Sequence, residues 1–359
     1  MKILHAYCLN YNLGDYALGY GLKKALRELM PIDLIAEVNL QGQVFDEYFI
    51  NNVNQKYDLL VIGGGGIIHG AHWPQGWFWL IEKELIKTIK IPFVVYAAGY
   101  NYFKDEQGIP ERGIAHLRET ARRARLFSVR NDGSHERLKS QTGINAEVMA
   151  DPGFWVGRNQ SFPWPIELPK DYVVVQLAND KPAHRFGGAQ NYQEVVNRLR
   201  GLIQRLAKKF HVLLAPHVFD DIAISRDVAV GLNNVSIWSF SDFAFDKVEK
   251  IFGYYQHAKC VLAMRGHGQI IPLSFGIPTI SLENHHKHRE LMEMIGLGQY
   301  NVDVTDVQLP EKVLGLVEQA ITNRPSIYTH LTERLDLLWK GTSDTIHAAF
   351  PELITTNQV

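Results

Sequence analysis

Short apolar runs rich in β-branched residues alternate with longer segments of helical period along most of this 359-residue chain. Such alternation is typical of a parallel sheet whose faces are covered by helices, and it disfavours all-β and all-α folds. The sequence therefore predicts an α/β protein. No repeat with a period of about 20 to 50 residues is visible, so solenoids and propellers are not expected.

The alternation breaks once, in a proline-containing segment at 157–170 that we interpret as a linker between two Rossmann-like domains. The first domain is expected at 1–156 and the second at 171–325, and a final helical segment at 326–359 either packs locally or crosses back. Strands are expected at 2–6, 58–62, 92–97, 126–129, 146–149, 172–177, 211–215, 235–238, 260–264 and 279–282, and helices at 16–30, 76–87 and 111–123.

Composition narrows the classes of function. Thirty-seven Lys and Arg residues against 38 Asp and Glu residues leave a net charge of -1, which provides no general field for a polyanion, so nucleic acid is not an expected partner. No apolar stretch approaches the roughly 18 residues of a membrane-spanning helix, and the amino terminus lacks a signal-like apolar region. We expect a cytoplasmic protein without a transmembrane segment.

Arg265-Gly266-His267-Gly268 lies between an apolar strand-like run and a segment of helical character. Residues two apart in an extended segment face the same way, so Arg265 and His267 can face one ligand while Gly266 lets it approach the backbone. A guanidinium offers a rigid fork to a carboxylate or phosphate, and an imidazole exchanges a proton near neutral pH. A salt-bridged arginine beside a hydrogen-bonded loop histidine fits the same letters, and both interpretations remain open.

Asn12-Leu13-Gly14-Asp15 stands where the first expected strand leads into the first expected helix. Asp15 is the expected N-cap, and the free amides at the helix start can hold an anion or a sugar hydroxyl. Capping alone would explain the same residues.

A run of four glycines at 63–66, which includes Gly64 and Gly65, follows the strand expected at 58–62. The bare backbone there can approach a ligand or a neighbouring helix, but neither a P-loop nor a convincing dinucleotide fingerprint follows. The aromatic stretch at 73–79 begins with Trp73 and offers faces on which sugar rings stack, although most of these rings are expected to fill the core.

Three further candidates follow expected strands. Arg130 either binds a ligand in the cleft or belongs to a helix-capping segment, and His217 is either a cleft acid, base or donor or a surface histidine beside a capping Asp. The histidine cluster at 285–288 is not expected to hold a metal, because adjacent residues cannot converge on one ion and Lys287 would repel it. Lys287 is instead a candidate for binding an anion.

Five segments, taken in order, resemble the polysaccharide pyruvyl transferase family: NLGD at 12–15, GGGG at 63–66, VRNDGS at 129–134, DPGF at 151–154 and RGHGQIIPLSFGIP at 265–278. The resemblance extends over about residues 3–297, and it is specific because the five segments occur together and in this order. It implies a GT-B-like pair of Rossmann-like domains with a central cleft. It also implies phosphoenolpyruvate as donor and transfer of pyruvate, as a ketal, to a sugar of a cell-surface glycan.

The resemblance implies that Arg265 binds the donor and that His267 acts at the reacting centre. The family also carries an arginine early in the second domain, where this sequence has other residues at 178–180, so Arg185 or Lys181 is expected to take its place. Phosphoenolpyruvate carries a carboxylate and a phosphate, so fixed cations suit it.

We therefore expect a pyruvyl transferase that uses phosphoenolpyruvate as a co-substrate and no cofactor or metal, with a saccharide or lipid-linked glycan as acceptor. Its homo-oligomeric state is left open. A GT-B glycosyltransferase using a nucleotide sugar and a non-catalytic glycan-binding protein are the alternatives. Donor contacts are expected from Arg265, Gly266, Gly268, Lys287 and Arg185, and acceptor or cleft contacts from Asn12, Gly14, Asp15, Gly64, Gly65, Trp73, Arg130 and His217.

Overall fold

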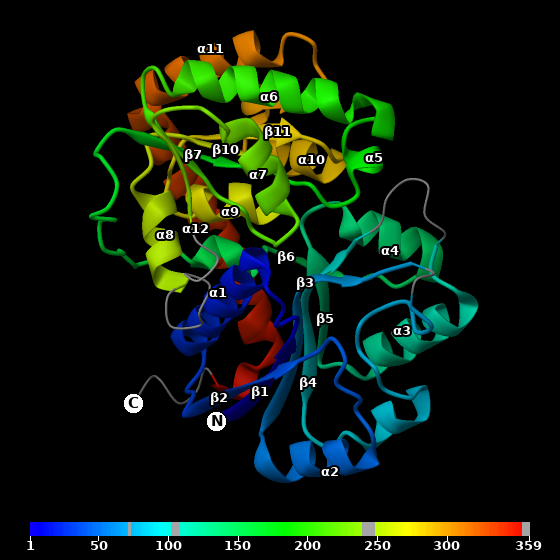
Figure 1. The fold of residues 1–359 in the computed structure, drawn as a ribbon. Coiled ribbons are helices and arrows are strands. Elements are labelled where there is room, and N and C mark those ends of the chain that lie inside the picture. The colour runs from blue at the N-terminus through cyan, green and yellow to red at the C-terminus, as the bar shows by residue number, and fades with distance from the viewer. Residues whose placement is uncertain (71–72, 102–107, 239–247, 354–359) are drawn as a thin grey trace. The chain divides into compact units, whose positions relative to one another are not determined.

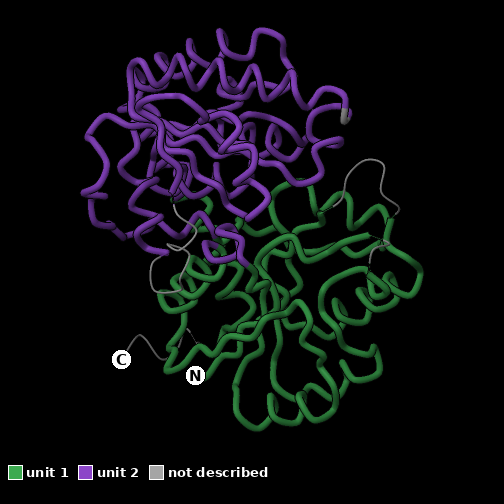
Figure 2. The backbone as a smooth tube through the Cα atoms, viewed as in Figure 1, with its two compact units in different colours: residues 1–10, 18–152, 336–359 green, residues 11–17, 153–335 purple. Residues whose placement is uncertain are grey.

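A computed structural model describes residues 1–70, 73–101, 108–238 and 248–353. The chain divides into two compact units (Figure 2). Unit 1 comprises Met1–Asn10, Leu18–Pro152 and Asp336–Val359, and unit 2 comprises Tyr11–Ala17 and Gly153–Leu335. Each unit contains a parallel sheet with flanking helices, which confirms the expected α/β class.

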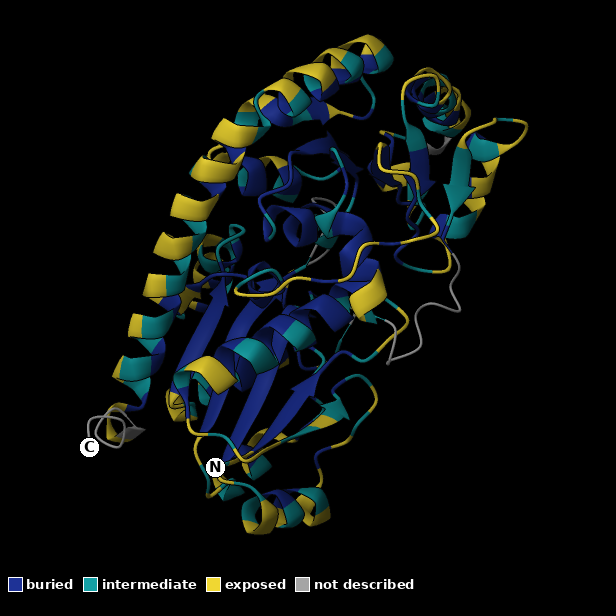
Figure 3. Ribbon diagram, turned by 90° about the vertical axis from the view of Figure 1, so that its left-hand side faces the viewer, coloured by how far each residue is buried: buried dark blue, intermediate teal, exposed yellow. Residues whose placement is uncertain are grey.

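The central strands of the sheet of unit 1 are buried on both faces. In the described part of the unit, six parallel strands lie in the order β2-β1-β3-β4-β5-β6. Their bounds are β1 Lys2–Tyr7, β2 Leu34–Asn39, β3 Leu59–Ile68, β4 Phe93–Tyr100, β5 Leu126–Arg130 and β6 Glu147–Met149. The helices are α1 Leu13–Leu29, α2 Glu47–Lys56, η1 Lys83–Thr88, α3 Glu111–Arg123 and α4 Ser134–Thr142. Figure 3 shows the central strands as buried along almost their whole length.

Consecutive residues of these strands enter two different apolar cores. One core joins the sheet to α1 and to the end of the chain, through Ile3, Val61, Val94, Leu22, Leu26, Ile346 and Phe350. The other joins the opposite face to α2, α3 and α4, through Leu4, Ile62, Val95, Ile50, Val53, Leu117 and Leu138. Because neighbouring positions on a strand point to opposite faces, burial on both faces produces the continuous apolar runs of the sequence.

The glycine run at 63–66 is part of a strand, so the expectation that the strand ends at residue 62 was wrong. Strand β3 continues through it to Ile68 and pairs with β4, with Gly63 opposite Tyr96. Gly63, Gly64 and Gly65 have φ values of 107°, 67° and 98°. A Cβ on Gly63 would lie 2.8 Å from the Tyr96 carbonyl oxygen, so the strands can pair this closely only without a side chain.

The prediction of a helix at 76–87 was also wrong, because 76–82 forms no helix and only the 3₁₀ helix η1 follows it. Trp77 and Trp79 are fully buried while Phe78 between them is not, which is the two-residue alternation of a strand. Trp77 pairs with Ile68 in an isolated bridge. As the core interpretation predicted, these two tryptophans fill the interior.

Unit 2 repeats the parallel plan. Among its described residues, six strands lie in the order β12-β11-β10-β7-β8-β9. The strands are β7 Tyr172–Gln176, β8 His211–Leu214, β9 Val235–Ile237, β10 Val261–Ala263, β11 Thr279–Glu283 and β12 Asn301–Asp303. The helices are η2 Pro152–Trp155, α5 Pro182–Arg185, η3 Ala189–Asn191, α6 Tyr192–Leu206, α7 Asp221–Ala229, α8 Val248–Gln256, α9 Gly266–Leu273, α10 His286–Met294, η5 Gly298–Tyr300 and α11 Leu309–Thr322. Helix α12 Arg324–Ala349 begins in unit 2 and ends in unit 1, which also contains η6 Pro351–Leu353. Helices α6 and α11 lie side by side (Figure 1).

The strand order of unit 2 reverses between β7 and β10. The chain begins the sheet at β7, moves outward through β8 and β9, and returns to β10 on the other side of β7. Loops that leave the carboxyl ends of such neighbouring strands diverge, and ligands of open α/β sheets bind at this switch point. Arg265 is the second residue after β10, and the loop at 177–181 follows β7.

Two segments belong to units that their sequence positions did not indicate. The first turn of α1 groups with unit 2 although the rest of this helix belongs to unit 1, and the last part of α12 groups with unit 1. The proline-containing segment at 157–170 groups with unit 2, where Gly157 donates its N–H to the Ser274 hydroxyl at 3.1 Å. The elements that the sequence did not predict include β2, α2, α6, α8, β12 and α11. None of the helices in the described ranges is both long and apolar enough to span a membrane.

Candidate functional site

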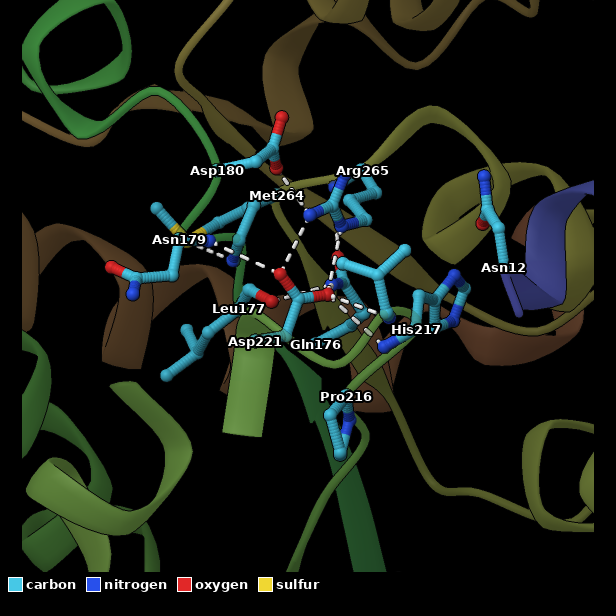
Figure 4. Close-up of polar contacts among 12 residues, drawn as sticks. Asn12, Gln176, Leu177, Asn179, Asp180, Pro216, His217, Asp221, Met264 and Arg265 are labelled. Carbon is cyan, nitrogen blue, oxygen red and sulfur yellow. Dashed lines mark hydrogen bonds and ion pairs between the residues drawn. The ribbon is translucent and has the colours of Figure 1, made fainter. Parts of the chain in front are cut away.

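Arg265 lies at the end of β10, where two carboxylates hold its guanidinium (Figure 4). Its Nε and Nη2 donate to the two oxygens of Asp221 at 2.8 and 2.6 Å, and Nη2 also contacts Asp180. The Asp221 side chain is fully buried, whereas that of Asp180 is 32% exposed. The structure thus shows Arg265 in a salt bridge, with hydrogen bonds from Nε and Nη2.

Asp180 joins Arg265 to a second arginine. Arg185 donates from Nη2 to the Asp180 carboxylate at 2.7 Å and from Nε to the Asp180 carbonyl at 2.7 Å. Its Nη1 donates to Asn284 Oδ1 at 3.0 Å, at the end of β11. Of the two residues that the sequence offered for the missing arginine, Arg185 is therefore brought to Arg265.

Asp221 also organises the loops around Arg265. Besides the guanidinium, its carboxylate accepts the backbone N–H groups of Asn179 at 3.1 Å and of His217 at 3.0 Å. Gln176, at the end of β7, accepts the Arg265 N–H at 2.8 Å through Oε1. One buried carboxylate thus connects the loops that follow β7, β8 and β10.

Charges within this cluster nearly balance. Burial opposes the charge of Arg265, but its hydrogen bonds to Asp221 and its attraction to both carboxylates raise its pKa above the ordinary value. Burial would raise the pKa of Asp180, yet Arg265 and Arg185 hold it below the ordinary value. The pKa of Arg185 is lowered because burial outweighs the attraction of Asp180. Two guanidinium groups and two carboxylates therefore face one another.

His217 is fully buried, so its interpretation as a surface histidine was wrong. Its Nε2 lies 2.6 Å from the Tyr255 hydroxyl, and its ring stacks on Trp238 with centroids 6.1 Å apart. Burial, and then the charges of Arg265 and His267, lower the pKa of His217 well below the ordinary value. The imidazole is therefore neutral near pH 7 and lies within electrostatic range of both residues of the Arg-x-His motif.

His267 packs against the start of α1. A Cβ placed on Gly14 would lie 2.5 Å from His267 Nδ1, which is too close for any side chain. The Leu13 N–H donates to the His217 carbonyl at 3.1 Å and fixes this turn to the loop after β8. The Asn-Leu-Gly-Asp motif and the Arg-x-His motif thus meet within unit 2.

The helix at this contact begins earlier than expected, so the prediction of Asp15 as N-cap was wrong. Asn12 accepts the Gly14 N–H through Oδ1 and the Asp15 N–H through its carbonyl, both at 3.0 Å. Asp15 therefore lies inside the first turn of α1. An Asn before Leu-Gly caps as well as an Asp, which is why the sequence alone did not decide between them.

The two glycines of the Arg265–Gly268 motif differ in their surroundings. A Cβ on Gly266 would have no heavy atom within 4 Å among the described residues, whereas one on Gly268 would lie 3.0 Å from Ala263 Cβ and Gln176 Oε1. Gly268 is therefore required for packing against β7 and β10. Arg265 is the N-cap residue of α9, and its side chain makes no capping bond to this helix.

Lys287 stands in the first turn of α10 and is half-buried. Its N–H donates to His285 Nδ1 at 3.2 Å, which caps that helix. The pKa of His288 is far below the ordinary value, first because of burial, and then because of nearby charges that include Arg185, Lys287 and Arg265. Lys287 thus lies within electrostatic range of an imidazole that both arginines also influence.

Several buried polar atoms around this cluster have no hydrogen-bond partner in the described part of the chain. They are Asn179 Oδ1, His217 Nδ1, Asn284 Nδ2 and His288 Nδ1. Buried polar groups are nearly always paired, and a concentration of exceptions needs a reason. These atoms offer both donors and acceptors to a small polar ligand at the switch point.

The candidates in unit 1 are placed differently. Arg130 is 9% exposed, and its Nη1 and Nη2 lie 3.0 Å from Asp151 and Asp132 respectively. A Cβ on Gly99 would lie 2.1 Å from Arg130 Nη2, so the guanidinium rests on the bare backbone of β4. This environment is that of a structural ion pair.

The other unit 1 candidates are Gly64, Gly65 and Trp73. Gly64 and Gly65 lie within β3, where a Cβ on Gly64 would contact Pro152 at 3.4 Å. Trp73 is partly buried, and its ring meets Phe78 edge to face at 4.7 Å. The two glycines thus serve strand packing, and Trp73 presents only part of its surface to solvent.

Sequence reasoning missed Asp221, Asp180 and Gln176 as members of the site. Asp221 was considered only as a helix cap beside His217. Its side chain instead accepts the His217 N–H, in the loop that precedes α7. Its position after a strand, like that of Asp180, was the available signal. Which carboxylate pairs with Arg265 depends on the strand order, which the sequence does not give.

Solved structures of low sequence identity share this architecture. UDP-GlcNAc 2-epimerase from Neisseria meningitidis, bound to UDP-GlcNAc, matches with a TM-score of 0.58 and 14% identity over 98% of this chain and 100% of that chain. A putative UDP-N-acetylglucosamine 2-epimerase from Listeria monocytogenes matches with a TM-score of 0.58 and 12% identity over 98% of this chain and 97% of that chain. UDP-GlcNAc 2-epimerase from Methanocaldococcus jannaschii matches with a TM-score of 0.54 and 13% identity over 89% of this chain and 92% of that chain. These likenesses show the GT-B fold.

A comparison with curated proteins finds no match. The family profile described as polysaccharide pyruvyl transferase matches residues 12–286, which is more than half of the chain. The match begins at Asn12, which caps α1, and ends at His286, the first residue of α10. It therefore includes the Arg265, Asp221 and Asp180 cluster and the contact between Gly14 and His267. The chain belongs to the polysaccharide pyruvyl transferase family.

Proposed function

We propose that this protein transfers pyruvate from phosphoenolpyruvate to two hydroxyl groups of a glycan, forming a ketal. The observation that carries the proposal is the placement of Arg265 and His267 together at the switch point of unit 2, with Arg185 joined to Arg265 through Asp180. Family membership supports a pyruvyl transferase of polysaccharide biosynthesis. The donor and the ketal product are the parts that we add.

The proposed donor site matches the charge of phosphoenolpyruvate. Its carboxylate and phosphate need fixed cations, and Arg265, Arg185 and Lys287 supply them on neighbouring loops. Asp221 is fully buried and holds one edge of Arg265 in place. Asp180 is more exposed and competes with the donor, so binding requires Asp180 to give up part of its contact with Arg265.

The proposed reaction is an addition followed by a substitution at C2 of the donor. One acceptor hydroxyl loses its proton and its oxygen bonds to C2, while a proton is delivered to C3 and converts the methylene group to a methyl group. The bond from C2 to the phosphate oxygen then breaks and phosphate leaves. A second hydroxyl oxygen bonds to C2 and loses its proton, which closes the ketal. No redox step or further cofactor is required.

His267 is the proposed acid that protonates C3. Its ring is held between the backbone of Gly14 and the start of α9, two residues after the donor-binding arginine. A positioned acid raises such a rate by roughly 100- to 10,000-fold, so its removal should be visible in turnover. Because phosphoenolpyruvate is made in the cytoplasm, the proposal also places the enzyme there.

Ligand-induced stabilisation tests the donor directly. We expect phosphoenolpyruvate to raise the melting temperature of the wild-type protein, and UDP-, GDP- and CMP-sugars to leave it unchanged. Arg265→Lys should abolish the rise, because one ammonium cannot replace a bidentate fork. Arg112→Lys is a matched control, since Arg112 makes an exposed ion pair with Glu82 at 3.2 Å. Stabilisation by a nucleotide sugar alone would instead support a glycosyltransferase.

A further inference from the structure

Two large aromatic side chains are exposed next to each other on unit 2. Tyr11 is 64% exposed and Phe219 is 54% exposed, and their ring centroids lie 5.5 Å apart with a tilt of 58°. Single exposed aromatic residues are common on protein surfaces and need no explanation. The Tyr11–Phe219 pair differs from such single residues, because the fold brings together two rings whose segments lie about 200 residues apart in the sequence.

The same segments that carry this pair also build the proposed catalytic centre. Tyr11 directly precedes the turn in which Gly14 supports His267, and Phe219 follows His217 by two residues. The hydrogen bond from the Leu13 N–H to the His217 carbonyl, at 3.1 Å, joins the two segments. Three residues of chain span at most about 11 Å, so the Tyr11 backbone lies within that distance of Gly14.

We propose that the Tyr11–Phe219 pair is a platform on which one sugar ring of the glycan acceptor stacks. The proposal rests on the pyruvyl transfer proposed above and assigns its acceptor subsite. The carbon-bound hydrogens on one face of a pyranose ring form an apolar surface that packs on aromatic faces. The Tyr11 hydroxyl adds a polar group that can bind a sugar hydroxyl at the edge of such a contact.

Charge separates this platform from the donor site. The cations that suit phosphoenolpyruvate lie in the segments after β7, β10 and β11, whereas the platform comes from the segment before α1 and the loop after β8 and carries no charge. His267 belongs to both regions, since it follows Arg265 by two residues and packs on Gly14. An anionic donor and a neutral sugar can therefore be bound by different segments that share one imidazole.

The test measures acceptor binding and turnover in Tyr11→Ala, Phe219→Ala and the double variant. Methyl glycosides of common hexoses and N-acetylhexosamines are the probes, titrated calorimetrically without phosphoenolpyruvate and then used as acceptors in a phosphate-release assay. Tyr11→Phe and Phe219→Tyr keep the rings and serve as conservative variants. Tyr48→Ala is the matched control, because Tyr48 is 79% exposed and lies in unit 1.

We expect each alanine variant to raise the Kd and KM for the acceptor by roughly tenfold, the upper end of what one aromatic contact contributes. The KM for phosphoenolpyruvate should stay within about twofold, Phe219→Tyr and Tyr48→Ala should behave as wild type, and Tyr11→Phe should lose only the part of the affinity that its hydroxyl contributes. Unchanged acceptor constants in the alanine variants, or a wild-type protein that binds no glycoside, would overturn the platform. Glycoside binding that depends on the pair without any release of phosphate would support the platform and refute the pyruvyl transfer.

Discussion

The buried carboxylate of Asp221 should be worth more to this fold than any other single charge of the site. Its oxygens accept from Arg265 Nε and Nη2 at 2.8 and 2.6 Å and from the backbone of Asn179 and His217 at 3.1 and 3.0 Å. Asp221→Asn keeps the shape but turns one acceptor into a donor that faces other donors. The Arg265 charge then lacks its buried partner.

Removing one partner of a buried ion pair typically costs about 3–5 kcal/mol, because the remaining charge stays uncompensated. The Asp180 contact of Arg265 persists in the variant and favours the lower end of this range. About 3 kcal/mol is a large part of a typical stability of roughly 5–15 kcal/mol. It corresponds to a fall in Tm of roughly 6–12 °C for a unit of this size.

Urea titration followed by circular dichroism measures this loss for Asp221→Asn, Arg265→Met and the double variant. We expect the double variant to be more stable than the sum of the two single losses predicts, by about 2 kcal/mol, because it contains no unpaired buried charge. A loss below about 1 kcal/mol for Asp221→Asn, or additive losses in the cycle, would refute the claim that this carboxylate holds the arginine in place.

Three further predictions concern single residues. Gly14→Ala should lower kcat by about 100-fold, because the alanine Cβ would lie 2.5 Å from His267 Nδ1 and displace the ring. As a control, Gly315→Ala should leave kcat unchanged, because a Cβ at Gly315 meets nothing within 4 Å. Asp180→Asn should lower the Kd for phosphoenolpyruvate, measured by calorimetry, by roughly tenfold, because it removes a competing anion. A higher Kd would show that Asp180 mainly positions the arginines. Burial lowers the pKa of His5 from 6.5 to about 4, so the unfolded state takes up the proton first as the pH falls. The free energy of unfolding should therefore drop by about 2 kcal/mol between pH 7 and pH 5. If the free energy of unfolding changes equally with pH in the wild type and in His5→Gln, this account is contradicted.

Much of the fold follows from local sequence. Strands buried on both faces, such as β1, β5 and β7, are continuous apolar runs, and α3 has the amphipathic period of a surface helix, so both kinds of element are visible without tertiary information. Strand β2 was missed because it is only partly buried and its sequence lacks such a run. The glycine run of β3 was misjudged because its extension depends on the close approach of β4, a contact that no local pattern records.

The site was predictable in its key residues but not in their connections. Arg265 and His267 stand at a strand end in a recognisable motif, and Gly14 stands in another, so each could be named from the sequence. That Gly14 supports His267, and that Asp221 and Asp180 share Arg265, depends on which loops the strand order of unit 2 brings together. Sequence gives the residue types at the strand ends, whereas the partners are set by the topology.

The central claim is that this chain moves pyruvate from phosphoenolpyruvate to a glycan with a proton delivered to C3. The most direct measurement is the reaction of the wild-type protein with phosphoenolpyruvate and a glycoside acceptor in deuterium oxide, with NMR and mass spectrometry of the sugar product and an assay of phosphate. We predict release of phosphate together with a sugar ketal whose methyl group carries one deuterium, and loss of both in His267→Gln. A product that keeps the enol group, or a sugar left unmodified across the acceptor panel, would contradict the account.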